Sequence, residues 1–148
     1  KYDCPNLKAL LSNPKTEKIF HFARFDIAAI KAYLDVDYTS IFCTKIASRL
    51  CRTYTDKHGL RNVTKELLGV DLDKQQQCSD WGAEDITELQ QIYAANDVLY
   101  LHKLRDILKE RLVREDRMAL AQQCFDFLPA RSDLDLLGWP ETDIFAHI

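Results

Sequence analysis

Glycine and proline are scarce in this sequence, with four of each among 148 residues. We find no repeat, low-complexity tract or linker, so a single helix-rich domain over residues 1–148 is the simplest organisation. No apolar run approaches the roughly 18 residues of a membrane span, and the beginning of the chain lacks the charged-then-apolar layout of a secretory signal. The sequence therefore predicts a soluble, cytoplasmic protein that makes no contact with a membrane.

Paired cysteines are also lacking. The five cysteines are an odd number, are widely scattered and form no C-x-x-C pair, which argues against a zinc site or a redox dithiol and favours a reducing cytoplasm. Cys43 and His58 together could in principle form a thiol hydrolase. No third orienting residue and no local nucleophile motif accompany them, so this alternative ranks far behind the others.

The chain has no excess of positive charge. Its formal charge is -3 and its pI is about 5.8, which argues against a protein that wraps a long nucleic-acid duplex but permits a short or metal-held substrate. Residues 44–65 are the exception, because they carry six basic residues against the single acid Asp56. This stretch could guide a phosphate, and a solvated helix face or an oligomer contact explains it equally well.

The hydrophobic spacing predicts an α/β protein in which helices dominate. We expect a strand at 18–22 and helices at 5–12, 25–34, 44–52 and 59–68, with Thr44 as a helix cap and Gly69 as a helix end. From residue 85 the apolar residues recur every three or four positions. This period predicts one long helix that runs toward residue 127 and stops at Pro129, followed by a loop-rich, apolar tail to residue 148.

Two carboxylates stand inside otherwise apolar stretches. Asp26 lies in HFARFDIAAI, and Asp97 lies in IYAANDVLYL, four residues after Tyr93, so the phenol and the carboxylate share one helix face. Burial of such carboxylates is costly unless a divalent cation or another partner compensates it. Spacing alone leaves an ordinary alternative open and even favours it, in which each Asp caps a turn or pairs with an Arg.

The motifs HFARFD (21–26) and YAAND (93–97) resemble the second and third motifs of DEDD exonucleases, and QCSDW (77–81) is similar to ribonuclease D. Tyr four residues before Asp is typical of the tyrosine subclass of this family. Phe22 departs from the Asn that is common at its position. Nano-RNase C, a group of bacterial oligoribonucleases, shares this departure and also resembles the segments 42–48, 53–56, 58–60, 74–77, 134–139 and 143–147.

The resemblance implies a ribonuclease H-like domain that removes nucleotides from the 3′ end of very short RNA, with dinucleotides preferred, and releases nucleoside 5′-monophosphates. It implies two divalent cations, Mg²⁺ or Mn²⁺, held in part by Asp26 and Asp97, and a water positioned by Tyr93. Homo-oligomers, as ring-shaped octamers, and action on DNA ends are further implications. The expected substrate contacts, with His21 in a supporting role, are His21, Arg24, His58, Lys74 and Gln75.

The first motif of the family, an Asp-x-Glu on an earlier strand, has no counterpart before residue 21. We expect a domain that is incomplete at its N-terminus and helix-rich because the strands with that motif are missing. The alternative is a catalytically inactive remnant that acts as a nucleic-acid-binding or interaction module. The coding sequence upstream of Lys1 distinguishes the two readings.

Overall fold

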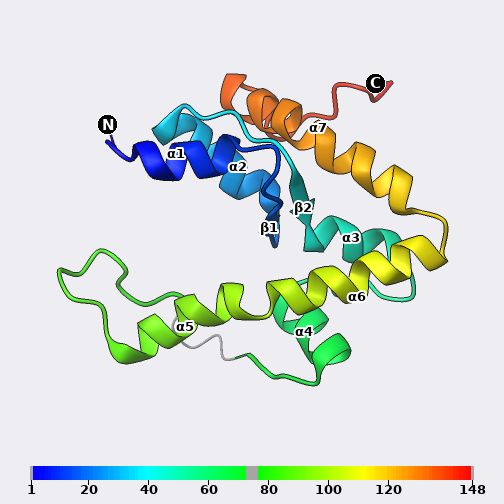
Figure 1. The fold of residues 1–148 in the computed structure, drawn as a ribbon, viewed down its shortest axis with the longest axis horizontal. Coiled ribbons are helices and arrows are strands. Elements are labelled where there is room, and N and C mark those ends of the chain that lie inside the picture. Colours follow the sequence, from blue (N-terminus) through cyan, green and yellow to red (C-terminus); the bar gives the residue numbers. More distant parts are fainter. Residues whose placement is uncertain (1, 73–76, 148) are drawn as a thin grey trace.

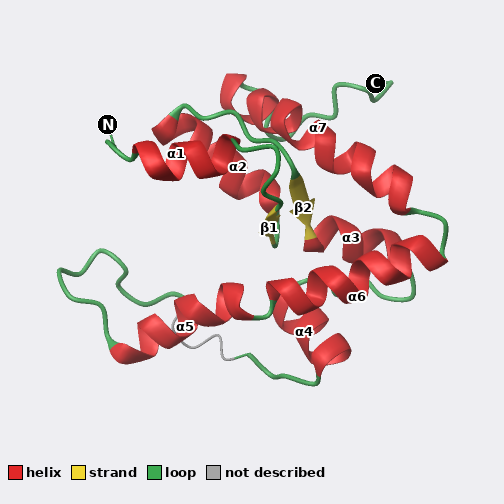
Figure 2. Cartoon of the chain, in the orientation of Figure 1, coloured by secondary structure: helices red, strands yellow, loops and turns green. Residues whose placement is uncertain are grey.

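The computed structural model describes residues 2–72 and 77–147. Within these ranges the chain forms seven helices and two strands, so helices dominate as predicted (Figure 2). None of the described helices is long and apolar enough to cross a membrane. The elements are α1 (Pro5–Ser12), β1 (Lys18–Phe20), α2 (Ala23–Leu34), β2 (Ile41–Cys43), α3 (Thr44–Cys51), α4 (Leu60–Leu68), α5 (Glu88–Leu99), α6 (Leu101–Arg114) and α7 (Met118–Leu137).

The sheet of the described residues consists of β1 and β2, which pair in parallel with Lys18 opposite Ile41 and Phe20 opposite Cys43. Because α2 connects the two strands, the unit is βαβ, and the predicted α/β class is confirmed. The strand β2 was not predicted. All three of its residues are buried, so it lacks the alternation of polar and apolar residues that marks a half-exposed strand.

Helices cover the short sheet on two sides. Figure 1 shows α1, α2 and α7 on one side of the strands and α4, α5 and α6 on the other. The rings of Phe42 in β2 and Phe125 in α7 lie 4.8 Å apart between their centroids, which ties the first side to the sheet. On the second side, Leu104, Leu108 and Leu112 of α6 are fully buried. Their spacing of four residues gives α6 a continuous apolar stripe that faces the core.

The single long helix predicted from residue 85 is wrong, because the chain forms α5, α6 and α7 instead. The helix α5 ends at Leu99, with Tyr100 as its C-cap. A turn with Asp116 in the left-handed region (φ 55°) separates α6 from α7. This turn reverses the chain, so that Ala121, Phe125 and Leu128 are buried against the sheet side that carries α2. A straight continuation would have left these residues without a core.

The predicted stop at Pro129 is also wrong, because Pro129 lies inside α7. Leu128 and Ser132 are buried on either side of it, so packing retains the helix despite the lost backbone N–H. The helix ends at Gly138, which adopts φ 117°, and loop and turn follow to residue 147. The loop-rich tail therefore starts about two turns later than predicted.

The other predicted helices are confirmed with small changes at their ends. Gly69 ends α4 in the left-handed conformation (φ 69°), as expected. The cap assigned to Thr44 is wrong, since Cys43 precedes α3 and the Thr44 hydroxyl donates to the Phe20 carbonyl oxygen at 3.1 Å. The first strand ends at Phe20 rather than at residue 22, because Phe22 turns into the left-handed region before α2.

Candidate active site

Asp26 lies in the first turn of α2, directly after the strand β1. Phe22 precedes this helix with φ 65°, a conformation that bulky residues rarely adopt, and it turns the chain sharply between strand and helix. The position of Asp26 near the helix N-terminus favours its charged form, whereas its partial burial disfavours it. The local sequence thus places a half-buried carboxylate at the end of a strand.

Asp97 and Tyr93 lie one turn apart on α5. A capping box begins this helix: the Gln90 backbone N–H donates to Thr87 Oγ1 at 3.1 Å, and the Thr87 N–H donates to Gln90 Oε1 at 2.8 Å. The Gln90 amide also donates to Ser79 Oγ at 2.9 Å. The segment that precedes α5 is therefore tied to the helix that carries Tyr93 and Asp97.

Asp26 and Asp97 line one cavity of about 410 Å³, together with His21 and Phe20. Burial, with a smaller contribution from the nearby charge of Asp97, raises the pKa of Asp26 to about 6. Burial also raises the pKa of Asp97, although this side chain is more exposed. The structure thus brings together the two carboxylates predicted from sequence, and their repulsion favours a shared cation.

Tyr93 faces a smaller neighbouring cavity of about 170 Å³, which Asn96 and Asp97 also line. The Trp81 and Tyr93 ring centroids lie 5.8 Å apart. Burial and then the charge of Asp97 raise the pKa of the Tyr93 phenol, so this group stays protonated at neutral pH. Asp97 therefore lines two cavities: one together with Asp26, and one together with the neutral phenol of Tyr93.

The donor set fits a divalent cation. Mg²⁺ prefers oxygen ligands and is commonly held by one or two carboxylates, with water and substrate phosphate oxygens completing its shell. Asp26 and Asp97 supply two such carboxylates at one cavity. Among the described residues no group of three or more His, Cys, Asp or Glu side chains forms a metal site. The described residues therefore supply part of the coordination shell of a cation and do not enclose it with protein ligands.

His21 lines the same cavity and is held by a long-range hydrogen bond. The Thr44 hydroxyl donates to the Phe20 carbonyl oxygen, so it accepts the bond from Nδ1 of His21 at 2.8 Å. Burial and then the charge of Lys45 lower the pKa of His21 to about 4. His21 is therefore a neutral ring that forms part of the cavity wall, and its supporting role toward a substrate stays a prediction. The sequence pattern predicts Thr44 as a helix cap and gives no sign of this bond to His21.

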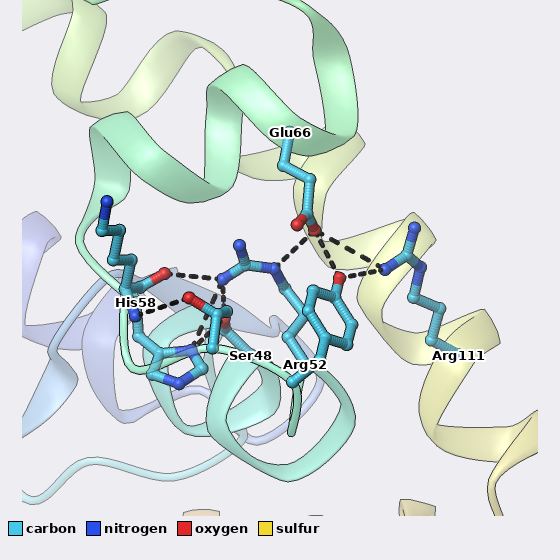
Figure 3. Close-up of polar contacts among 8 residues, drawn as sticks. Ser48, Arg52, His58, Glu66 and Arg111 are labelled. Carbon is cyan, nitrogen blue, oxygen red and sulfur yellow. Dashed lines mark hydrogen bonds and ion pairs between the residues drawn. The ribbon is translucent and has the colours of Figure 1, made fainter.

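His58 belongs to a buried polar network rather than to the wall of the acidic cavity (Figure 3). Its Nδ1 lies 2.7 Å from Ser48 Oγ, and the guanidinium of Arg52 donates to Ser48 Oγ at 2.9 Å and to Glu66 at 2.7 Å. Only 8% of His58 is exposed. These contacts support a structural role for His58, and its contact with substrate stays a prediction.

Arg24 does not line the cavity that the two carboxylates share. Arg24 donates to Asp135 at 2.7 and 2.5 Å, and this partner, which sequence reasoning missed, raises the pKa of Arg24. Cys43 Sγ accepts a bond from the Ala23 N–H at 3.4 Å. The hydrogen bonds of the described residues thus join neither Cys43 nor His58 into a thiol–imidazole pair. Lys74 and Gln75 lie outside the described residues.

Comparison with known proteins adds to this geometry. Residues 2–113 match the family described as 3′-5′ exonuclease. Ribonuclease D of Gluconacetobacter diazotrophicus is 34% identical over 140 residues, which are 95% of this chain and 33% of that protein. The chain thus spans about a third of the length of this relative.

Solved structures of NrnC, the abbreviated name of nano-RNase C, from Brucella melitensis also match. The structure bound to pGG has a TM-score of 0.95 and 51% identity, and the match covers 100% of this chain and 72% of that one. The structure with bound Mg²⁺ has a TM-score of 0.93 and 51% identity over 99% of this chain and 71% of that one. The family match and these likenesses together show that the chain belongs to the 3′-5′ exonuclease family, with ribonuclease D-like relatives.

Proposed function

We propose that this chain forms the catalytic part of a metal-dependent 3′-5′ exoribonuclease that acts on short RNA. The observation that carries the proposal is the cavity where Asp26 of α2 and Asp97 of α5 meet. Family membership supports hydrolysis of a phosphodiester bond at a 3′ end. The cytoplasm, where short RNA is degraded, is the proposed location.

Each residue has a distinct proposed role. Asp26 and Asp97 hold divalent cations, Mg²⁺ or Mn²⁺, which when bound supply charge stabilisation and an acidified water. The proposed number of cations is two, as in the family pattern. Tyr93 keeps its proton and orients the attacking water through a hydrogen bond. The neutral His21 holds the wall of the cavity against β2 through Thr44.

The proposed substrates are RNA dinucleotides, and the products are nucleoside 5′-monophosphates. The support is the similarity to NrnC, one structure of which contains pGG and another Mg²⁺. The same proposal extends to DNA ends. The negative net charge agrees with a small substrate, since long nucleic acids demand many more cationic contacts.

Hydrolysis of a 5′-labelled diribonucleotide tests the proposal. The purified chain, and a form extended upstream through an Asp-x-Glu motif, are incubated with Mn²⁺ and with EDTA. We expect metal-dependent release of labelled mononucleotide, and a loss of at least about 100-fold in Asp97→Asn, because a cation ligand is removed. The exposed Asp85 provides the matched control, and Asp85→Asn retains the rate. Equal rates in Asp97→Asn and the parent contradict the proposed site.

A second function, a non-catalytic nucleic-acid-binding or interaction module, is favoured by one observation. The described residues supply two carboxylates at the cavity and no larger cluster of metal ligands. The same experiment separates the two functions when Mg²⁺ is used beside Mn²⁺ and binding of the dinucleotide is measured as well. A chain that binds the dinucleotide but hydrolyses it in neither form, with either metal, supports the module and overturns the enzyme.

A further inference from the structure

A third cavity, of about 580 Å³, lies between the beginning of α2, the helix α3 and the helix α7. Its described lining shares no residue with that of the cavity around Asp26 and Asp97. The two are nevertheless neighbours in sequence, since His21 lines one and Phe22 the other. Its volume lies within the roughly 300–1,000 Å³ typical of small-ligand sites. The catalytic proposal leaves this cavity without a role.

Four cationic side chains line this third cavity, and they differ in their partners. Arg24 and Arg131 both pair with Asp135, at 2.5 and 3.1 Å. Lys45 and Arg49 lie one turn apart on α3, and within the described part of the chain neither has a carboxylate within 4 Å. Like charges at this spacing repel each other and destabilise a helix. An anion between Lys45 and Arg49 removes that repulsion.

Two aromatic rings also line this cavity. Phe22 adopts a left-handed backbone conformation, and 46% of its surface is exposed. The Lys45 Nζ lies 4.6 Å from the centroid of its ring. Phe127 of α7 also lines the cavity and is 39% exposed. Exposed rings offer flat faces on which a nucleic-acid base stacks. The cavity thus combines a place for an anion with a place for a planar, apolar group.

We propose that this cavity binds a nucleoside monophosphate unit, with the phosphate between Lys45 and Arg49 and the base against Phe22. The choice of a nucleotide over other aromatic anions rests on the proposed function. The unit has two possible sources: the 5′ nucleotide of a short RNA whose 3′ end occupies the acidic cavity, or a free mononucleotide. The chemistry that recognises both is the same.

Calorimetric titration of AMP into the full chain in EDTA tests the proposal without any hydrolysis. We expect binding that weakens about tenfold or more in Lys45→Gln/Arg49→Gln, because charge-assisted bonds to the phosphate are lost. The matched control is Lys103→Gln/Arg114→Gln, which removes the same charges from exposed positions of α6 and leaves the affinity unchanged. Thermal unfolding of each variant verifies that the fold is intact.

Two further measurements separate the parts of the site. Phe22→Leu keeps an apolar side chain under the same backbone strain, so it weakens AMP binding but leaves the weaker binding of ribose 5-phosphate unchanged. Asp26→Asn/Asp97→Asn abolishes hydrolysis and retains AMP binding, which separates this site from the catalytic proposal. Absence of AMP binding at millimolar concentration, or equal affinity in Lys45→Gln/Arg49→Gln and its control, overturns the proposal.

Binding of a diribonucleotide distinguishes the two possible sources of the nucleotide. If the site holds the 5′ nucleotide of bound RNA, Lys45→Gln/Arg49→Gln weakens the binding of the diribonucleotide to Asp97→Asn protein in Mg²⁺ as strongly as it weakens AMP binding. If the site takes free mononucleotide, the affinity for the diribonucleotide is unchanged while AMP binding is lost. Both results support the site, and each selects one source.

Discussion

At the scale of single residues, His21 links the candidate site to folding. Burial and the charge of Lys45 hold the pKa of this imidazole at about 4, while the unfolded chain titrates near 6.5. Between these values the unfolded chain binds a proton that the folded chain does not, so His21 makes folding less stable as the pH falls. Asp26 acts oppositely, because its raised pKa lets the folded chain bind a proton first.

The contribution of His21 can be isolated with His21→Asn, which retains an N–H donor toward Thr44 but does not titrate. Relative to this variant, we expect the parent to lose up to about 3 kcal/mol of unfolding free energy between pH 7 and pH 4. Urea denaturation in EDTA at several pH values measures the difference. Parallel pH profiles for the two proteins contradict a neutral, buried His21.

A second prediction at this scale concerns Glu66 in the network around His58. The Arg52 side chain is 3% exposed, and its Nε donates to Glu66 at 2.7 Å, while Tyr54 donates to the same carboxylate at 2.6 Å. Glu66→Ala leaves a buried guanidinium without its carboxylate. We expect a loss of about 2 kcal/mol, less than for a fully buried pair because Glu66 is 37% exposed on its side chain.

Chemical denaturation measures this effect against Glu110→Ala, a control on the exposed face of α6. The control is expected to change stability by no more than about 0.5 kcal/mol. A result in which Glu66→Ala is as stable as the control indicates that water solvates Arg52 in place of the carboxylate.

At the scale of elements, the capping box determines how firmly α5 holds Tyr93 and Asp97. Thr87→Ala removes the oxygen that accepts the Gln90 N–H, and we expect the helix to lose about 1 kcal/mol. Hydrogen exchange of the α5 amides is expected to quicken about fivefold, whereas exchange in α7 stays unchanged. Thr87→Ser, which keeps the hydroxyl, is the matched control. Equal exchange rates in Ala and Ser variants contradict a stabilising cap.

Pro129 gives an opposite prediction for α7. It lies inside the helix, so the carbonyl oxygen one turn before it has no backbone N–H partner at this position. Pro129→Ala restores that bond and is expected to stabilise the protein by about 1 kcal/mol or more, as judged by its thermal midpoint. A lower midpoint for Pro129→Ala shows that the ring contributes more through packing than the helix gains.

The sequence predicts those helices whose formation depends on residues close together in the chain. The apolar spacing of α1, α2 and α4 and the glycine that ends α4 could be read from sequence, because each depends on residues within a turn or two. The break between α5 and α6 could not be read in this way, since the apolar period continues across Tyr100. The short strand β2 has no periodicity of its own, and only pairing with β1 defines it.

In the candidate site, too, local spacing is predictable from the sequence and contacts between distant segments are not. The shared helix face of Tyr93 and Asp97 follows from a spacing of four residues. Their approach to Asp26 does not, because it depends on how α5 packs near α2, and only the family motifs indicated it. Likewise the hydrogen bonds that His21 donates to Thr44 and Arg24 donates to Asp135 join distant segments, and no local pattern predicts them.

At the scale of the whole molecule, large apolar side chains remain exposed along α5. Leu89, Ile92, Val98 and Leu99 are each between 51% and 64% exposed. Exposed apolar side chains gathered on one element commonly mark an interaction surface. Together with the octamer implied by the family resemblance, this surface supports self-association of the chain as a proposal.

Sedimentation velocity tests self-association. We expect the chain to sediment as a multiple of its 17.2 kDa mass, and Leu89→Glu/Ile92→Glu to shift it to the monomer, because charges at a buried contact remain unpaired. Gln91→Glu adds a charge to the same helix at an exposed polar position and is the matched control. If the parent sediments as a monomer at all concentrations, α5 does not join copies of this chain, and the octamer proposal fails for it. If only the double variant dissociates, the apolar residues of α5, rather than the net charge of the helix, hold the assembly.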